Sequence, residues 1–165
     1  MRPWSWAWNA TWRTVRGVHP ALAAPDDAWA DRRLPGPERA LYRRMDPRER
    51  DHAVRVARAV LLRRPNASDE LVRAALLHDV GKSRRGYRVS ERILVHLVGG
   101  GAVPPEPRLG GLAGARQVAR HHAAYGAAMI REAGGAPRVA DLVARHERPG
   151  DDPDARLLHE VDRAT

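Results

Sequence analysis

The stretch that decides the fold is AALLHDVGK at residues 74–82, where an apolar helix runs directly into His78 and Asp79. Buried charged groups are costly unless they are paired, hydrogen-bonded or bound to a metal ion. Lys82 closes the stretch and is the only lysine among the 29 basic residues of the chain. In a chain that uses Arg elsewhere, one Lys indicates a place for a compact ammonium group that a planar guanidinium would not replace. The stretch therefore predicts a functional polar centre at the end of a core helix.

From about residue 37 onward the sequence pattern is helical throughout, and no convincing strand run occurs. Asp46 followed by Pro47 and Glu49 is a strong N-terminal signal for a helix. Gly81 is placed to stop the apolar helix, and a Gly-Gly pair closes a long later helix. The expected helices cover residues 37–45, 47–64, from Asn66 or Ser68 to 79, 90–98, 114–133, 137–146 and 154–163, with a Gly- and Pro-rich loop over 99–113. The pattern predicts an all-α fold.

Length and composition restrict the class of protein. With 165 residues the chain is expected to form one core, and with no Cys it excludes disulfides, zinc-thiolate sites and cysteine nucleophiles. Any metal must be held by His, Asp or Glu. No apolar run reaches transmembrane length, so we expect a cytoplasmic protein. The formal charge of +9 suits an anionic partner such as a nucleotide, nucleic acid or phosphorylated lipid, although solvated Arg-rich helix faces account for it equally well.

The first 33 residues differ from the rest because they hold all five Trp residues, at positions 4, 6, 8, 12 and 29. Spacings of four suit a helix and spacings of two suit a strand, so the period is ambiguous. We predict a Trp-rich N-terminal extension over 1–33 and one domain over 34–165. The extension is expected to pack over the domain or against a second copy in a homodimer, with an interfacial membrane anchor as the alternative.

Five predicted helices each direct a His or an Asp toward the interior: His52, His78 with Asp79, His122, His146 and Asp162. Taken singly, each is more often a hydrogen-bonded core residue or a helix cap. Together they would desolvate or repel one another unless a cation compensates. Neutral imidazole with carboxylate suits Mn, Fe, Co, Ni or Zn, and helical bundles build such centres from facing helices. The joint pattern predicts a divalent metal site.

The order of these elements resembles the His…His-Asp…Asp signature of the HD-domain phosphohydrolases. HAAYGAAMI at residues 122–130 is similar to that family's His-x-x-x-Gly-Ala segment, and the similarity covers about residues 38–165. The resemblance implies an all-α HD-domain helical bundle in which one metal is held by His52, His78, Asp79 and Asp162. In members with two metals, the positions matching His122 and His146 help to hold a second ion, which Asp79 bridges to the first.

The resemblance also implies one or two divalent ions per chain, Mn or Fe foremost, with Co, Ni, Zn or Mg as alternatives. Asp79 and Lys82 are then the catalytic residues, with Lys82 on the substrate phosphate. Arg84, Arg85 and Arg88 could hold the rest of a nucleotide, although a solvated loop explains these arginines equally well. One departure concerns Glu147, because two-metal cyclic-dinucleotide phosphodiesterases usually have a second His there and also carry a longer GYP-type motif that is missing here.

The expected function is a metal-dependent phosphohydrolase that cuts a nucleotide or related phosphate ester with metal-activated water. A mononucleotide phosphatase, a dinucleoside polyphosphate hydrolase and a cyclic-dinucleotide phosphodiesterase all stay open. The alternative is a basic module that binds nucleic acid or an anionic surface and keeps a structural or vestigial HD metal site. A single-strand nuclease would combine both properties.

Overall fold

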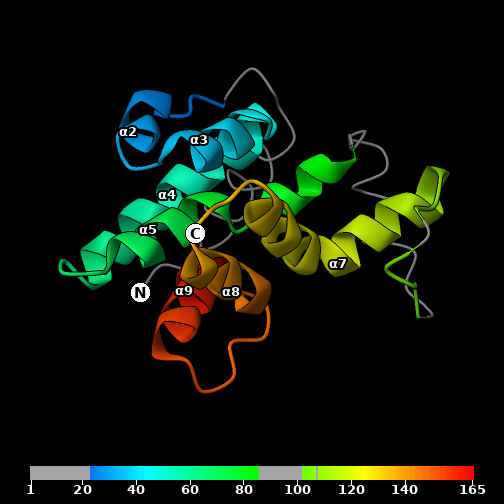
Figure 1. The fold of residues 1–165 in the computed structure, drawn as a ribbon. Helices are drawn as coiled ribbons and strands as arrows, with labels where there is room; N and C mark the ends of the chain where they lie inside the picture. The colour runs from blue at the N-terminus through cyan, green and yellow to red at the C-terminus, as the bar shows by residue number, and fades with distance from the viewer. Residues whose placement is uncertain (1–22, 86–101, 107) are drawn as a thin grey trace, which may run out of the picture.

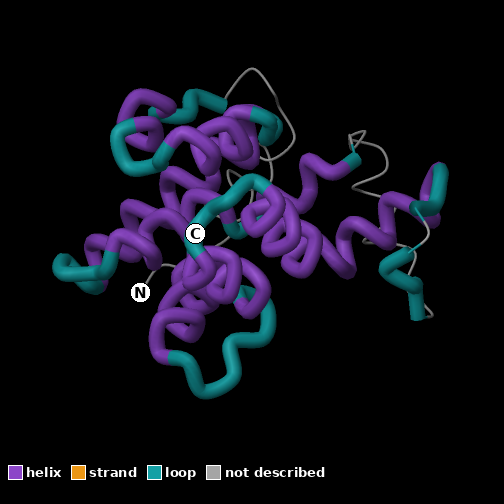
Figure 2. Tube along the Cα trace, viewed as in Figure 1, coloured by secondary structure: helices purple, strands orange, loops and turns teal. Residues whose placement is uncertain are grey.

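The computed structural model describes residues 23–85, 102–106 and 108–165. Figure 1 and Figure 2 show helices joined by loops, and no strand occurs in this part of the chain. The elements are α2 (Asp27–Asp31), α3 (Gly36–Arg43), α4 (Pro47–Arg63), α5 (Asp69–Leu77), the 3₁₀ helix η2 (Val80–Arg84), α7 (Gly111–Glu132), α8 (Pro137–Arg145) and α9 (Pro153–Ala164). The predicted all-α fold is confirmed. The helix expected over 90–98 and the tryptophans at 4, 6, 8 and 12 lie outside the described residues.

Capping residues set the helix ends where the sequence indicated them. The Asp46 side chain accepts a hydrogen bond from the Arg48 amide at 3.0 Å and opens α4. Of the two candidates for the start of α5, Ser68 is the cap, and its Oγ accepts from the Leu71 amide at 3.3 Å. Gly134 ends α7 with a φ of 76°, the left-handed conformation that glycine adopts without a steric penalty.

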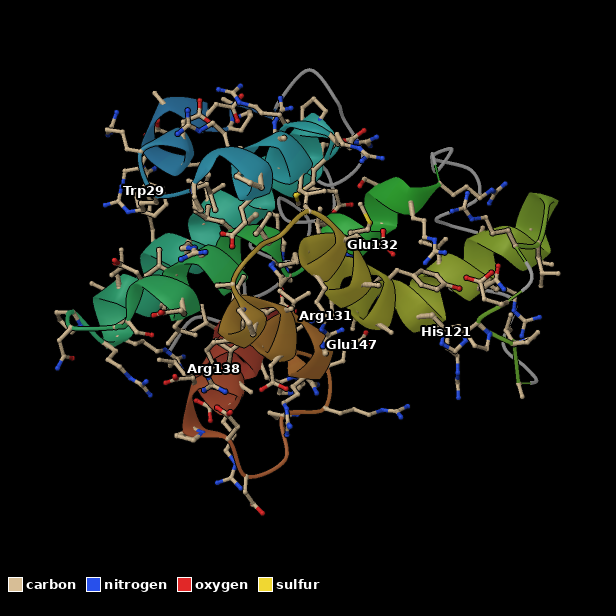
Figure 3. The ribbon with its side chains drawn as sticks, viewed as in Figure 1. Trp29, His121, Arg131, Glu132, Arg138 and Glu147 are labelled. Carbon is tan, nitrogen blue, oxygen red and sulfur yellow. The ribbon has the colours of Figure 1, made fainter. Side chains whose placement is uncertain are left out.

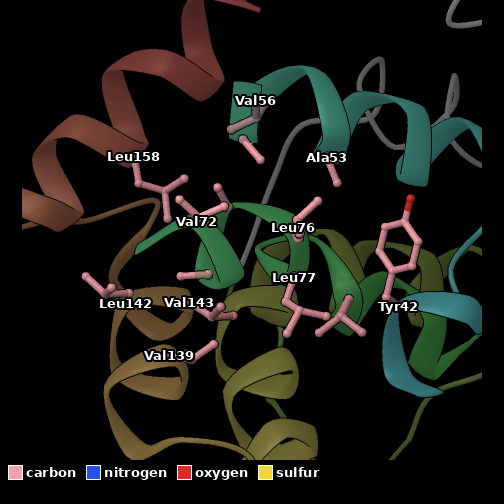
Figure 4. Close-up of a cluster of buried hydrophobic side chains, with 14 of the residues drawn as sticks. Tyr42, Ala53, Val56, Val72, Leu76, Leu77, Val139, Leu142, Val143 and Leu158 are labelled. Carbon is pink, nitrogen blue, oxygen red and sulfur yellow. The ribbon is translucent and has the colours of Figure 1, made fainter. Parts of the chain in front are cut away.

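Helix α5 forms the centre of the molecule and packs against α3, α4, α8 and α9. Figure 4 shows Val72 of α5 beside Leu158 of α9, and Leu76 of α5 on the side of Ala53 of α4. Leu76 and Leu77 are fully buried. Burying a Leu side chain completely contributes about 1.5–3 kcal/mol relative to leaving it in water. This packing fixes the end of α5, and therefore His78 and Asp79, inside the bundle.

Two expectations about boundaries are wrong. Helix α5 ends at Leu77, and Gly81 has no positive φ, so it does not stop the helix by a left-handed turn. Gly81 instead lies in η2 against the backbone of α7, where an added Cβ would meet the His122 carbonyl oxygen at 1.9 Å. The loop expected over 99–113 ends at Gly110, since α7 begins at Gly111.

The short helix α2 lies within the segment predicted as the N-terminal extension and rests on α3 and α4. Ala30 and Leu34 are buried in the core, and the Tyr42 hydroxyl of α3 donates to Asp27 Oδ1 at 3.0 Å. The Trp29 ring, labelled in Figure 3, has the Arg33 guanidinium carbon 3.8 Å from its centroid. The boundary between extension and domain stays a prediction. No described helix has the length and apolar character needed to cross a membrane.

Candidate metal centre

Five helical elements bring six ionisable side chains to one place in the bundle. His52 comes from the middle of α4, His78 and Asp79 follow α5, His122 lies within α7, His146 follows α8, and Asp162 lies near the end of α9. They form two triads, each with its ligand atoms within 4.8 Å of one another. The first triad is His52, His78 and Asp162, and the second triad is Asp79, His122 and His146.

The first triad joins residues 110 positions apart in the chain. His52 Nε2 lies 2.8 Å from Asp162 Oδ1, and His78 Nε2 lies 3.3 Å from the same oxygen. The His52 and His78 rings meet edge to face, with centroids 5.3 Å apart. His78 is fully buried, whereas the His52 and Asp162 side chains are about a quarter exposed. The first triad is therefore shielded from solvent on the His78 side and accessible to solvent on the side of His52 and Asp162.

The second triad is more deeply buried and shares the His78–Asp79 peptide with the first. His122 Nε2 lies 3.4 Å from Asp79 Oδ1 and 3.2 Å from His146 Nε2. The other oxygen, Asp79 Oδ2, lies 3.5 Å from His78 Nε2. Each carboxylate oxygen of Asp79 thus faces a different triad, which is the arrangement a bridging ligand needs.

Three of the histidines are oriented by the same type of hydrogen bond to the backbone of their own helix. Their Nδ1 atoms lie 2.8–3.0 Å from the carbonyl oxygen three residues earlier; the pairs are His78 with Ala75, His122 with Ala119, and His146 with Val143. A ring nitrogen facing a carbonyl oxygen must carry the proton, so each Nε2 of the neutral ring offers a lone pair to the centre. Metal-ligating histidines typically show this hydrogen bond.

The donor set fits a divalent cation. The Nε2 atoms of His122 and His146 face each other at 3.2 Å, and two lone pairs so close require a proton or cation between them. His78 Nε2 is buried and makes no hydrogen bond of acceptable geometry within the part of the chain that the structure describes. Imidazole nitrogens with carboxylate oxygens suit Mn, Fe, Co, Ni or Zn.

The electrostatics of the centre couple these groups strongly. Burial lowers the pKa of His78, but the Asp79 and Asp162 carboxylates outweigh it and raise the pKa to about 9. Burial and the nearby His78 charge lower the pKa of His146 to about 4. Burial opposes ionisation of Asp162, yet the hydrogen bond from His52 and the nearby His78 imidazole hold its pKa far below the usual range. The centre therefore keeps its carboxylates ionised and favours a cation among them.

Lys82 lies at the rim of the centre, where Nζ is 2.6 Å from Asp79 Oδ2 and 3.6 Å from Glu49 Oε2. The carboxylate of Glu49 is buried, and the sequence analysis named this residue only as part of a helix-start signal. The available signal was its position on α4 three residues before His52, because residues at i and i+3 share a helix face.

His159 is a second residue that the sequence analysis missed. Its Nδ1 donates to the His146 carbonyl at 2.8 Å, so α9 fixes the backbone of a second-triad residue and also supplies Asp162 to the first. Glu147, labelled in Figure 3 where α8 ends, has Oε1 3.8 Å from His122 Nε2 and is nearly half exposed. It lies at the edge of the second triad.

Two of the predicted substrate-binding arginines, Arg84 and Arg85, lie at the end of η2, the element that follows Asp79. Arg84 pairs with Glu106 at 2.9 Å and stacks on Tyr125, and together with Arg85 it lines a cavity. Arg88 is outside the described residues. His121, labelled in Figure 3, donates from Nε2 to the Val103 carbonyl at 2.6 Å and so faces the segment 102–106 instead of the triads.

A family model described as HD domain matches residues 50–165, which is more than half of the chain and includes both triads. The resemblance carried by the ordered His and Asp elements is therefore confirmed. Neither a curated protein nor a solved structure shows significant similarity to the chain.

Proposed function

The chain belongs to the HD-domain family, a superfamily of metal-dependent phosphohydrolases, and we propose that it hydrolyses a nucleotide or a related phosphate ester. The observation that carries this proposal is the pair of triads joined through His78 and Asp79, with imidazole nitrogens turned toward a shared interior. Such an arrangement would destabilise an ordinary helical core, because burying several ionisable groups is costly without a compensating cation.

In this proposal His52, His78 and Asp162 hold one divalent ion, and Asp79, His122 and His146 hold a second or complete the first site. Such an ion supplies a Lewis acid that polarises a phosphoryl oxygen and lowers the pKa of bound water. The mixed nitrogen and oxygen donors favour Mn or Fe over Mg, which prefers oxygen ligands alone. The carbonyl-bound Nδ1–H groups keep the rings oriented while the carboxylates stay ionised.

Lys82 contributes a positive charge toward the phosphate. Its ammonium lies between Asp79 and the buried carboxylate of Glu49, and this position keeps it at the rim with 29% of its side chain exposed. Glu49 holds the ammonium close to the centre from the α4 side. A substrate phosphate that approaches from solvent meets Lys82 beside the two triads, where its negative charge is offset as the phosphorus is attacked.

The test is a screen of purified protein supplied with Mn²⁺ against phosphomonoesters and phosphodiesters, together with elemental analysis. We expect bound metal and turnover, and we expect Asp79→Ala to lose about 100-fold in kcat/KM, because it removes the carboxylate of the second triad and the oxygen that faces His78 of the first. Asp151→Ala is the matched control, since Asp151 is exposed in the turn before α9. Unchanged metal content and activity in Asp79→Ala would refute the proposal.

A further inference from the structure

Lys82 and the first triad face the same oxygen atom of Asp79. Lys82 Nζ lies 2.6 Å from Asp79 Oδ2, and Nε2 of His78 lies 3.5 Å from that oxygen. His78 is fully buried, and Asp79 is only 4% exposed. The ammonium group of Lys82 therefore lies against a buried carboxylate oxygen that a metal ion on His78 would also use.

A divalent ion bound to Asp79 Oδ2 would lie close to the Lys82 ammonium. Carboxylate oxygens bind an ion such as Zn²⁺ at about 2.0–2.2 Å. Because Nζ is 2.6 Å from the same oxygen, the ion and the ammonium nitrogen would be at most about 4.8 Å apart. Two positive charges at this separation repel each other strongly in a buried site, where the effective dielectric constant is low. A metal ion and Lys82 therefore compete for Asp79 Oδ2.

Glu49 is a second carboxylate within reach of the same ammonium. Its Oε2 lies 3.6 Å from Lys82 Nζ, and only 9% of the Glu49 side chain is exposed. Glu49 lies on α4 three residues before His52, so both side chains belong to one helix face. Lysine carries its three donors on a flexible four-carbon chain, so its ammonium can keep one carboxylate partner while it leaves another. The Glu49 carboxylate thus offers Lys82 a position that does not require Asp79.

We propose that Lys82 competes with the divalent ion for Asp79 Oδ2, and that Glu49 is a positioning residue that accepts the ammonium when the ion binds. The inference rests on the proposed hydrolase function, because it concerns the ion that this function requires. It goes beyond that function by giving Lys82 two positions. On Asp79 the ammonium opposes metal binding, and on Glu49 it lies at the rim, where a substrate phosphate would meet it.

The binding test measures the Kd of the first Mn²⁺ bound, by calorimetry at fixed pH and ionic strength, on the full chain freed of metal by chelation. We expect Lys82→Met to bind Mn²⁺ at least about tenfold more tightly, because the competing ammonium is gone. We expect Glu49→Gln to bind it at least about tenfold less tightly, because the ammonium then stays on Asp79. A Kd that Lys82→Met leaves unchanged or weakens would overturn the proposal.

The double variant separates an action through Lys82 from a direct attraction between Glu49 and the ion. If Glu49 acts by accepting the ammonium, adding Glu49→Gln to Lys82→Met should change the Kd less than about twofold. If Glu49 attracts the ion by its own charge, the tenfold loss would persist in the double variant, and the role given to Glu49 would be wrong. Lys82→Gln is a second variant for the same measurement should Lys82→Met fail to fold, as circular dichroism would show.

The matched control is the exposed ion pair of Arg63 with Glu160, whose nearest charged atoms are 3.3 Å apart. Arg63→Met and Glu160→Gln make the same changes of charge as the two test substitutions, in side chains that are about half exposed or more. We expect each control to leave the Kd for Mn²⁺ within about twofold of the wild type, since exposed charges are screened. Shifts as large as those at Lys82 and Glu49 would show a general charge effect and overturn the proposal.

Turnover distinguishes this inference from the proposed function. With saturating Mn²⁺ and a phosphate ester that the wild type hydrolyses, Lys82→Met should lose about 100-fold in kcat/KM although it binds the ion more tightly. A wild type that hydrolyses the ester, with a Kd that Lys82→Met does not tighten, would overturn the competition and leave the hydrolase function standing. A chain that shows the expected shifts in Kd but hydrolyses no phosphate ester would overturn the function and leave the competition at Asp79.

Discussion

The orientation of His78 and His146 follows from the places where their helices end. The last four carbonyl groups of an α-helix lack intrahelical partners. Helix α5 ends at Leu77 and α8 ends at Arg145, so the carbonyls of Ala75 and Val143 are among these groups, and each accepts the Nδ1–H of the histidine that follows. In each case one hydrogen bond gives a partner to a carbonyl group at the helix end and also directs the Nε2 atom of the histidine into the centre.

Metal affinity is expected to rise with pH, because a cation and a proton compete for His78. Its pKa of about 9 means that the metal-free protein carries a proton there at neutral pH, and a metal ion binds only the neutral ring. Below pH 9 each unit of pH therefore weakens binding about tenfold, and the Kd for Mn²⁺ should weaken roughly 100-fold from pH 8 to pH 6. Calorimetry in two buffers of different ionisation enthalpy at pH 7 should show about one proton released per ion bound at this site. A Kd independent of pH would contradict the assignment.

The same histidine contributes to the pH dependence of folding in the metal-free chain. A group whose pKa is raised in the folded state stabilises it most below its unfolded pKa, about 6.5 for His, and this stabilisation is lost as the pH rises through 9. His146 acts in the opposite sense, since its lowered pKa of about 4 makes folding less favourable as the pH falls from 6.5 to 4. These two groups together favour the folded state most near pH 6.5.

At the scale of elements, the close approach of η2 to α7 decides whether the second triad forms. Gly81 makes this approach possible, because a Cβ at this position would collide with the backbone of α7 at His122 and Gly126. Since η2 follows Asp79 directly and α7 carries His122, the contact sets the distance between these two side chains. Glycine is needed here for its missing side chain and not for its backbone freedom.

Gly81→Ala is therefore expected to destabilise the fold by about 1–3 kcal/mol, the usual range for overpacking, and to lower the metal content. The control is Gly36→Ala in α3, where an added Cβ meets nothing within 4 Å and the change should be neutral or slightly stabilising. Urea denaturation and elemental analysis measure the two effects. A Gly81→Ala chain as stable and as metal-rich as the wild type would contradict the role given to this contact.

A buried ion pair connects α3, α5 and the start of α8. Glu38 of α3 is fully buried, accepts from Arg73 Nε of α5 at 2.7 Å, and also accepts from the Ala136 amide at the start of α8 at 3.2 Å. Arg73→Ala would leave the carboxylate buried without its partner and is expected to cost about 3–5 kcal/mol in urea denaturation. Arg63→Ala, which breaks an exposed pair with Glu160, should cost less than about 1 kcal/mol. Equal effects of the two substitutions would show that Glu38 is adequately solvated.

Helix existence could be predicted from the sequence because capping signals and apolar stripes are local properties. Asp46 with Pro47, Ser68 and Gly134 acted as predicted, and the apolar AALL run does form the central helix. Helix α2 was missed because it has five residues and lies in a Trp-rich segment of ambiguous period. Two features could not be predicted: the division of the six site residues into two triads, and the contacts of Glu49 and His159. Both depend on how α4, η2, α8 and α9 pack, and local sequence patterns do not determine that packing.

Across the whole molecule, much of the excess of Arg is engaged in ion pairs between elements. Arg138 of α8, labelled in Figure 3, pairs with Asp152 and Asp154 at the start of α9, and Arg58 of α4 pairs with Asp26 before α2. The Asp152 side chain also caps α9, so the same contacts orient the helix that carries Asp162. The net charge of +9 is therefore compatible with a folded enzyme as well as with a polyanion-binding surface.

Removal of metal should destabilise the entire fold, because the two triads connect α4, the end of α5, α7, the end of α8 and α9 at a single point. An ion that binds only the folded state stabilises it by about 2.7 kcal/mol at a free concentration 100 times its Kd. For a chain of this size we expect chelation by EDTA to lower Tm by roughly 5–11 °C, measured by calorimetry or circular dichroism at fixed pH. Asp151→Asn should respond as the wild type does, whereas Asp79→Asn should melt at the same temperature with and without EDTA. If EDTA left the Tm of the metal-loaded wild type unchanged, these five elements would not share a bound ion, and both triads would have to be interpreted as hydrogen-bonded parts of the core.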